Sequence, residues 1–314
     1  MIEQGLNVRN KTDRHAYLIK AHNQFELLHM VCRLLDHPNH DLFIHIDKKV
    51  TDFDEEALRC HVKYSGVYFT PERLDISWGS STQVWMELLL FKEAHAHGPY
   101  SYYHIFSGVD LPLKPSGEIY DFFQSHKGKQ FIHYSTDDFI AKKGTKYRVS
   151  LYHFLQQRVG RKKSFLMQVE RASLMLQRVL GIDRTRSYGR AAGAGANWAS
   201  VTQELVDTLM KEEAWIRKHF RWCRNADEAY LQTFVNGTRF RNDLYMPDPQ
   251  DDYHSCMRYI DFSRGDGNGS PYTWRSCDFD ELIHSGFMFA RKFDLNVDRE
   301  ICYRLEAYLT GKTE

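Results

Sequence analysis

The sequence has little net charge, no long apolar run and no leader-like start. Its 314 residues carry 42 Lys and Arg against 41 Asp and Glu, so the overall charge gives no reason to expect nucleic acid as a partner. No apolar segment approaches the roughly 20 residues that cross a bilayer, and residues 1–15 lack the apolar centre of a secretion signal. We therefore expect a folded, soluble protein in the cytoplasm or at the inner membrane surface.

The chain also lacks the residue spacings that cross-link small domains or bind zinc. Its six cysteines include no CxxC pair, and its 16 histidines include no HExxH motif. Most of the cysteines are expected to be buried thiols, and a zinc site is not expected. The hydrophobic content of 42% is enough to build one large domain or two small ones.

A βαβ unit is predicted near the amino terminus. Residues 16–22 form a short apolar run, residues 25–35 repeat apolar side chains at helical spacing, and residues 41–47 form a second apolar run that ends on a carboxylate. Such a unit implies a parallel sheet whose ligand crevice lies at the carboxyl ends of the strands. His22 and Asp47 would lie there, where a nucleotide could bind, and a loop cap is the less favoured alternative for Asp47.

The same periodicities predict further elements of an α/β fold. Strands are expected at 67–69, 102–107, 130–135 and 258–262, and helices at 82–96, 118–124, 164–180, 225–237 and 297–310. Glycine and proline predict an irregular loop at 108–115, which carries Asp110 after a strand. The Met and Leu stripe of 164–180 indicates a core helix rather than a membrane anchor. The basic segment 141–163 indicates a solvated connector, with an anionic acceptor or a membrane surface as the alternative contact.

Two neighbouring cations lie in an apolar segment near the carboxyl terminus. Arg291 and Lys292 are flanked by Phe289 and Phe293. If these aromatics fold inward, they would hold a cation in a dry cleft, where it attracts an anion such as phosphate far more strongly than in water. The alternative is that both cations lie on the solvated side of an ordinary strand.

Two other stretches carry candidate chemistry. Asp227 and Glu228 would lie in the first turn of a predicted helix, where carboxylates also occur simply because they favour the helix dipole. The Gly and Ala run at 193–202 lacks the Lys-Ser/Thr pair of a phosphate-binding loop. Its small residues would let Asn197 and Trp198 approach a bound sugar, whereas a place in the core is the alternative for Trp198.

Seven stretches occur in the order typical of one enzyme family. They are AYLIKAH (16–22), DLFIHID (41–47), DISWGS (75–80), YYHIFSGVDLPLKP (102–115), GAGANWASV (193–201), ADEAYLQTFV (226–235) and MFARKFD (288–294). On these residues the chain resembles the core-2/I-branching β-1,6-N-acetylglucosaminyltransferases, a family that also contains the peptide O-xylosyltransferases, and it looks like a soluble, bacterial-type member. The resemblance runs from Ala16 to Asp294.

The resemblance implies an α/β fold of the GT-A-like, Rossmann-like kind, with a central, mainly parallel mixed sheet flanked by helices. It implies a single domain over 1–314, in which a nucleotide-binding half (15–135) and an acceptor and catalytic half (190–314) are joined by a basic helical segment (141–180). The expected partners are a nucleotide sugar and a glycan acceptor, with peripheral contact to a lipid-linked acceptor and no nucleic acid. The oligomeric state is left open.

The resemblance further implies transfer of a sugar, with N-acetylglucosamine expected, from a UDP-sugar to a glycan hydroxyl, with inversion and without a divalent metal or other cofactor. In such a reaction one carboxylate takes the proton of the acceptor, while fixed cations stabilise the leaving UDP. The alternatives are a transferase that uses UDP-xylose as its donor, a manganese-dependent transferase, and a non-catalytic module that binds a nucleotide sugar or a glycan. The Asp-Phe-Asp triplets at 52–54 and 278–280 could mimic a metal motif, but we interpret both as helix-start carboxylates.

The resemblance also implies the site residues, most of which lie in these stretches, whereas Arg148, Arg275 and Arg258 lie outside them. Glu228 takes the place of the catalytic base, with Asp227 beside it. The donor-binding residues are expected to be His22, Asp47, Trp78, Arg275 and Lys292, with Arg258 as the substitute for Arg275. The acceptor-binding residues are expected to be Asp110, Arg148, Asn197 and Trp198. No metal-binding residue is expected.

Overall fold

The computed structural model describes residues 13–160, 165–249, 252–267 and 269–311. Its centre is a six-stranded sheet in the order β3-β2-β1-β4-β7-β6. The strands are β1 (His15–Ala21), β2 (His40–Ile46), β3 (Gly66–Phe69), β4 (Tyr102–Ser107), β6 (Phe131–Ile132) and β7 (Ala199–Thr202). β1 pairs in parallel with β2 and β4, and β2 with β3, whereas β7 is antiparallel to both of its neighbours. This mainly parallel mixed sheet confirms the predicted fold class.

The sequence of β1 is a continuous apolar run because side chains on both faces of this strand are buried. Successive side chains of a strand point to opposite faces of the sheet. Tyr17 and Ile19 enter one apolar cluster, and Ala16 and Leu18 enter the other. Both faces of the strand are therefore buried, as is typical of parallel sheets, and the predicted βαβ unit is confirmed.

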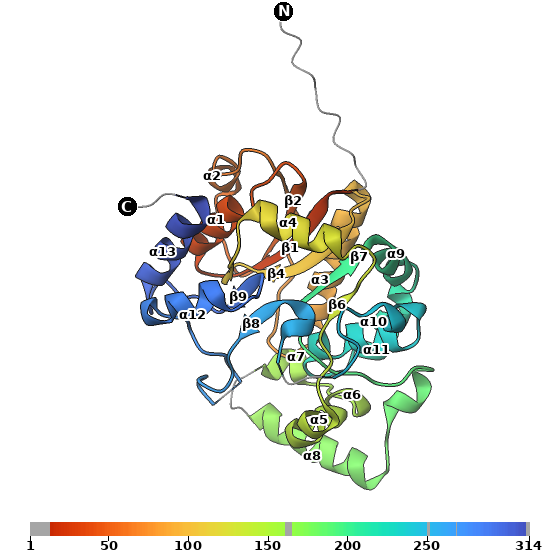
Figure 1. The fold of residues 1–314 in the computed structure, drawn as a ribbon. Helices are drawn as coiled ribbons and strands as arrows, with labels where there is room; N and C mark the ends of the chain where they lie inside the picture. Colours follow the sequence, from red (N-terminus) through yellow and green to blue (C-terminus); the bar gives the residue numbers. More distant parts are fainter. Residues whose placement is uncertain (1–12, 161–164, 250–251, 268, 312–314) are drawn as a thin grey trace, which may run out of the picture.

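Helices cover both faces of this sheet (Figure 1). The cluster on the Tyr17 side includes α1 (Phe25–Leu34), α2 (Glu55–Arg59), α4 (Ser116–Ser125), α12 (Phe279–His284) and α13 (Arg299–Thr310). The cluster on the other side includes α3 (Thr82–His97), α9 (Gln203–Lys211), α10 (Glu213–Phe220) and α11 (Tyr230–Asn236). Short 3-10 turns occupy Arg184–Ser187, Ala226–Glu228, Arg239–Asp243, His254–Cys256 and Ser276–Asp278. The single helix predicted at 225–237 is thus a 3-10 turn followed by α11.

A second, three-stranded sheet corrects the prediction of an irregular loop at 108–115. β5 (Asp110–Pro112) pairs in antiparallel register with β9 (Phe289–Arg291), which in turn pairs in parallel with β8 (Arg258–Ile260). Glycine and proline correctly indicate a turn here, but they carry no information about a partner strand far along the chain. That partner places Asp110 directly opposite Arg291.

Four helices form a separate group below the sheet in Figure 1, and we call this group the lower helical unit. It consists of α5 (Asp137–Lys143), α6 (Thr145–Ser150), α7 (Gln156–Val159) and α8 (Phe165–Val179). The prediction that α8 is a core helix is wrong, because its two buried side chains are Glu170 and Gln177 and most of its apolar side chains are exposed. Of the basic run predicted to be a solvated connector, residues 161–163 lie outside the described ranges.

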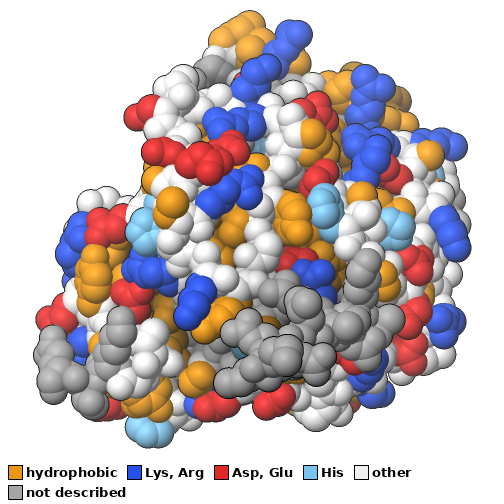
Figure 2. Space-filling view, turned by 90° about the horizontal axis from the view of Figure 1, so that it is seen from above, with side chains coloured by type: hydrophobic (Ala, Val, Ile, Leu, Met, Phe, Trp, Pro, Cys, Tyr) orange, Lys and Arg blue, Asp and Glu red, His pale blue; other side chains and the backbone are white. Residues whose placement is uncertain are grey.

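The opposite end of the molecule has a mixed surface. Figure 2 shows it from the side that lies at the top of Figure 1, with acidic and basic side chains interspersed and hydrophobic side chains scattered among them. Within the described ranges, every helix is too short or too polar to cross a bilayer.

Candidate active site

A cavity of about 760 Å³ opens at the carboxyl end of β1. Its lining includes residues that directly follow β1, residues that precede β7, and residues that follow β9. Among the lining residues are His22, Trp78, Gln83, Arg148, Asn197, Trp198, Arg224, Asp227, Glu228, Arg291 and Lys292. This location agrees with the expectation that ligands bind beyond the carboxyl ends of parallel strands.

Glu228 reaches the cavity from the 3-10 turn that precedes α11. Arg148 Nη1 donates to Glu228 Oε2 at 2.5 Å, and Asn225 Nδ2 donates to Glu228 Oε1 at 3.2 Å. Asn225 has a φ of 47°, a left-handed conformation that asparagine adopts more readily than most residues. Its backbone N–H donates to the carbonyl of Gly79 at 2.8 Å, which ties the turn to the segment before α3.

Asp227 is buried behind Glu228 and is held by two amides. Asp227 Oδ2 accepts hydrogen bonds from Gln83 Nε2 at 3.1 Å and from Asn197 Nδ2 at 3.0 Å. Because only 4% of the residue is exposed, these bonds fix its carboxylate in one position. Asp227 therefore joins α3, the segment before β7 and the turn that carries Glu228.

Both carboxyls have a raised pKa. Burial raises the pKa of Asp227, while the charge of Lys20 and the hydrogen bond from Asn197 oppose the shift. Burial and then the neighbouring Asp227 raise the pKa of Glu228, and the Arg148 cation lowers it. The Glu228 side chain nevertheless keeps 41% exposure, so it remains accessible from the cavity. A raised pKa makes a carboxylate a stronger proton acceptor at neutral pH.

Two cations reach the same cavity from the end of β9. Lys292 Nζ donates to Ser270 Oγ. Arg291 forms an ion pair with Asp110, whose side chain is fully buried, and its guanidinium lies 4.7 Å from the ring centroid of Trp198. The pairing of β5 with β9 thus holds one of the cations in place.

The predicted donor residues near β1 and β2 differ in their positions. His22 lines the cavity, and burial lowers its pKa while the Asp47 carboxylate opposes that shift. Asp47 does not line the cavity; it accepts a hydrogen bond from the backbone N–H of Lys49 at 2.9 Å and pairs with Lys49 Nζ at 3.2 Å. Trp78 lines the cavity and is 37% exposed.

Eight of the eleven predicted site residues line this one cavity. The three that do not are Asp47, Asp110 and Arg275. Arg275 is exposed at the start of the Ser276–Asp278 turn. Its substitute, Arg258, is fully buried, donates to the carbonyl of Cys256 at 3.0 Å and lies over the ring of Phe289.

The expected site residues did not include two of the lining cations, Arg291 and Arg224. Arg291 lines the cavity beside Lys292, whereas Arg275 and Arg258 do not. Its position next to Lys292 in an apolar segment was the available signal. Arg224 lies 6.0 Å from the ring centroid of Trp78, and no sequence pattern had indicated it.

The described residues contain no group of three or more His, Cys, Asp or Glu side chains that could hold a metal ion. One carboxylate of each Asp-Phe-Asp triplet lies at a helix start, as predicted. Asp54 caps α2 by accepting from the N–H of Ala57 at 2.9 Å. Asp278 lies at the start of α12 and accepts from the N–H of Arg275 at 2.9 Å.

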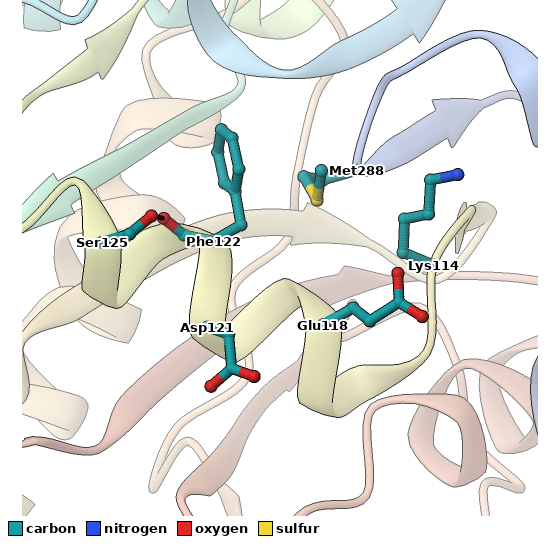
Figure 3. A pocket seen from close by; sticks show the side chains of 6 residues that line it. All are labelled: Lys114, Glu118, Asp121, Phe122, Ser125 and Met288. Carbon is teal, nitrogen blue, oxygen red and sulfur yellow. Dashed lines mark hydrogen bonds between the residues drawn. The ribbon is translucent and has the colours of Figure 1, made fainter.

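A second hollow, of about 480 Å³, lies along α4 and contains none of the predicted site residues. Figure 3 shows that most of its side chains come from that one helix. Lys114 and Met288 complete it, and Lys114 Nζ donates to the carbonyl of Ile283 at 3.0 Å. The predicted catalytic carboxylates and the cations of β9 thus lie in the larger cavity.

Comparison with known proteins gives one family. A model of the Core-2/I-branching enzyme matches residues 15–283. Xylosyltransferase sqv-6 of Caenorhabditis briggsae is 23% identical over 296 residues, covering 84% of this chain and 32% of the relative. Xylosyltransferase 2 of Bos taurus is 21% identical over 322 residues, covering 95% of this chain and 34% of the relative. The chain therefore spans about a third of the length of these curated relatives.

Among solved structures, the apo form of mouse xyloside xylosyltransferase 1 has a TM-score of 0.30 and 10% sequence identity, covering 71% of this chain and 82% of that one. The family model, by contrast, matches most of the chain and includes β1, the Asp227–Glu228 turn and the segment before β7. The chain therefore belongs to the Core-2/I-branching enzymes, a family of glycosyltransferases.

Proposed function

We propose that this protein is a metal-independent, inverting glycosyltransferase that moves N-acetylglucosamine from a UDP-sugar to a glycan hydroxyl. The observation that carries the proposal is that Glu228, a carboxylate with a raised pKa, shares one cavity with the cations Arg291 and Lys292. Asn197 binds Asp227 and the adjacent Trp198 contacts Arg291, so this dipeptide connects the carboxylates with the cations.

Each group has a separate task in a single displacement. Glu228 accepts the proton of the acceptor hydroxyl while that oxygen attacks the anomeric carbon, and the bond to UDP breaks with its electrons moving to the diphosphate. Lys292 and Arg291 stabilise this developing negative charge, and they do so as fixed groups that need no reorganisation during the reaction. Asp110 acts through Arg291, because it is fully buried and pairs with that guanidinium.

The remaining cavity residues divide between the two substrates. His22 and Trp78 are proposed to contact the donor, with Asp47 acting near His22. Arg148, Asn197 and Trp198 are proposed to contact the acceptor. Arg291 replaces Arg275 in our proposal, since it lines the cavity beside Lys292 and Arg275 does not.

Xylose is the second candidate for the transferred sugar. The relatives are named xylosyltransferases, and this favours UDP-xylose as an alternative donor. The same base and the same cations would serve either sugar, because both act on the anomeric carbon and the diphosphate rather than on the rest of the ring.

The test is release of UDP from UDP-N-acetylglucosamine, UDP-xylose and UDP-glucose, with and without EDTA. We expect one donor to be hydrolysed, no effect of EDTA, and a rate about 10²- to 10⁴-fold lower in Glu228→Gln. Glu213→Gln is the matched control, because Glu213 pairs with Arg217 on α10 away from the cavity lining. Full activity of Glu228→Gln would place the base elsewhere. Release that stops with EDTA would show a metal-dependent enzyme, and no release from any donor would favour a sugar-binding module.

A further inference from the structure

Helix α8 presents its apolar side to solvent. Its exposed apolar side chains, with that of the residue directly after it, are Phe165, Leu166, Val169, Met175, Leu176, Val179 and Leu180. Phe165 is 80% exposed and Val179 is 77% exposed, values typical of charged side chains rather than of large apolar ones. Residues 165, 169, 172, 176 and 179 are spaced by three or four positions, so they form one stripe along the helix.

The opposite, polar side of α8 is fixed to the protein. Gln177 Oε1 accepts from the N–H of Tyr152 at 2.7 Å, and Gln177 Nε2 donates to the Tyr152 carbonyl at 3.0 Å. Glu170 Oε2 accepts from the N–H of Leu155 at 3.2 Å, and Glu170 lies 3.6 Å from His153 Nδ1. Turning the apolar stripe inward would break these buried hydrogen bonds. The exposed stripe is therefore a property of the fold.

The chain around α8 is strongly cationic. Residues 139–202 contain 13 Lys and Arg but only two acidic residues, Glu170 and Asp183, whereas the whole chain has a net charge of +1. Arg158, Arg171 and Arg178 are exposed, while Glu170 is buried. A second copy of this chain would bring the same positive charge against the stripe, but an anionic surface would be attracted to it.

We propose that α8 is a membrane-surface helix whose apolar stripe inserts into the interface of an anionic bilayer while the surrounding cations bind lipid head groups. At 15 residues the helix is too short to span a bilayer, so it would lie in the membrane plane. Insertion of an apolar stripe and binding of basic side chains to anionic head groups together give stable binding of a protein to a membrane.

The lower helical unit also forms part of the wall of the active-site cavity. Arg148 of α6 binds Glu228, and Gln156 of α7 donates to the carbonyl of Trp78 at 3.2 Å. A bilayer bound at α8 would thus contact the same helical unit that forms this wall, and it could carry a glycan on a lipid toward the acceptor side. This consequence rests on the proposed function, whereas membrane binding itself does not.

The test is co-sedimentation with vesicles of phosphatidylcholine and phosphatidylglycerol, compared with vesicles of phosphatidylcholine alone. We expect the wild type to bind the anionic vesicles, and Leu176→Glu/Val179→Glu to bind them at least about tenfold more weakly. Val297→Glu/Tyr308→Glu is the matched control, since both residues are exposed and apolar but lie outside the lower helical unit. All three proteins should release UDP from the soluble donor at the same rate, so loss of vesicle binding is separated from loss of activity.

Three results would overturn the proposal. The first is wild-type protein that stays in the supernatant with anionic vesicles, and the second is equal binding to both vesicle types. The third is a dimer of the wild type in solution that Leu176→Glu/Val179→Glu converts to a monomer, because the stripe would then be a protein interface. Reduced vesicle binding by Arg171→Glu/Arg178→Glu, with unchanged UDP release, would support it.

Discussion

At the scale of single residues, the Arg148–Glu228 ion pair sets how the active site responds to pH. Burial and the neighbouring Asp227 raise the pKa of Glu228, and Arg148 lowers it. The proposed base must be ionised, so activity falls as the pH drops below the pKa of Glu228. Arg148 therefore extends the active range toward lower pH.

We predict that Arg148→Met moves the acid limb of the kcat/KM profile to higher pH. Without the cation, the pKa of Glu228 rises further, and a smaller fraction of the enzyme carries an ionised base at a given pH. The measurement is kcat/KM against pH for the wild type, Arg148→Met and Arg148→Lys, with the lysine variant expected to restore part of the shift. An equal loss of activity at every pH would show instead that Arg148 acts only in binding.

Some of the residues that line the cavity could be singled out from their neighbours in the chain. Lys292 could be singled out by its flanking phenylalanines, and Glu228 by the predicted helix start. The ion pair of Arg291 could not be predicted, because its partner Asp110 lies 181 residues earlier and meets it only across the second sheet. The residues next to Arg291 in the sequence do not indicate such a pair.

At the scale of elements, one carboxylate fixes the start of the last helix. Asp298 Oδ1 accepts from the N–H of Ile301 at 3.1 Å at the beginning of α13. Asp298 Oδ2 accepts from the N–H of Ser276 at 2.8 Å, which connects α13 with the turn before α12. The same side chain therefore caps a helix and joins two segments.

We predict that Asp298→Ala lowers the free energy of unfolding by about 1–3 kcal/mol, because it removes a helix cap and leaves the Ser276 N–H without its acceptor. Asp54→Ala is the matched control. Asp54 caps the short helix α2 through one exposed hydrogen bond, so we expect a loss of about 1 kcal/mol or less. Urea unfolding of both variants measures the difference, and equal losses would contradict the bridging role of Asp298.

Regular elements with a clear apolar period could be predicted, and elements defined by distant partners could not. The spacing of apolar residues placed α1 and α3 to within two residues of their observed ends. α8 has an equally clear period, yet the stripe faces outward because Glu170 and Gln177 bind the backbone of residues 152 and 155. Periodicity shows that a helix has an apolar side, but it does not show what that side contacts.

At the scale of the whole molecule, the sequence predicted the parallel half of the sheet better than the antiparallel half. The βαβ unit follows from consecutive segments, and such crossovers obey strict rules. β7 instead inserts between β4 and β6 in antiparallel register after a long excursion through the lower helical unit. Nothing in residues 199–202 specifies those neighbours.

Three of the fully buried histidines of the central sheet, His15, His40 and His104, lie on adjacent strands. His15 of β1 lies opposite His40 of β2, with ring centroids 5.5 Å apart, and His104 of β4 stacks on Tyr17 at 4.6 Å. Burial lowers the pKa of His40 to about 3 and the pKa values of His15 and His104 well below 6.5. The folded protein therefore holds these rings in their neutral form.

We predict that these histidines make the fold less stable in mild acid. A histidine whose pKa is lower in the folded state than in the unfolded state stabilises the fold fully at a pH above its unfolded pKa of 6.5. This contribution is lost as the pH falls below 6.5, because the unfolded chain then binds protons that the folded chain excludes. Each such histidine should lower the free energy of unfolding by about 1.4 kcal/mol as the pH falls from about 7.5 to about 5.5.

Carboxyls with a raised pKa, such as Glu87 and Glu228, act in the opposite direction, so the test compares slopes rather than absolute values. The loss of unfolding free energy over this range should be about 1.4 kcal/mol smaller in His40→Gln than in the wild type, since glutamine binds no proton. His284→Gln is the control, because His284 is exposed at the end of α12 and lies outside the buried cluster. Urea unfolding at the two pH values gives both slopes. If His40→Gln and the wild type lose the same free energy, His40 is protonated in the folded protein, and the neutral histidine cluster does not account for any acid sensitivity.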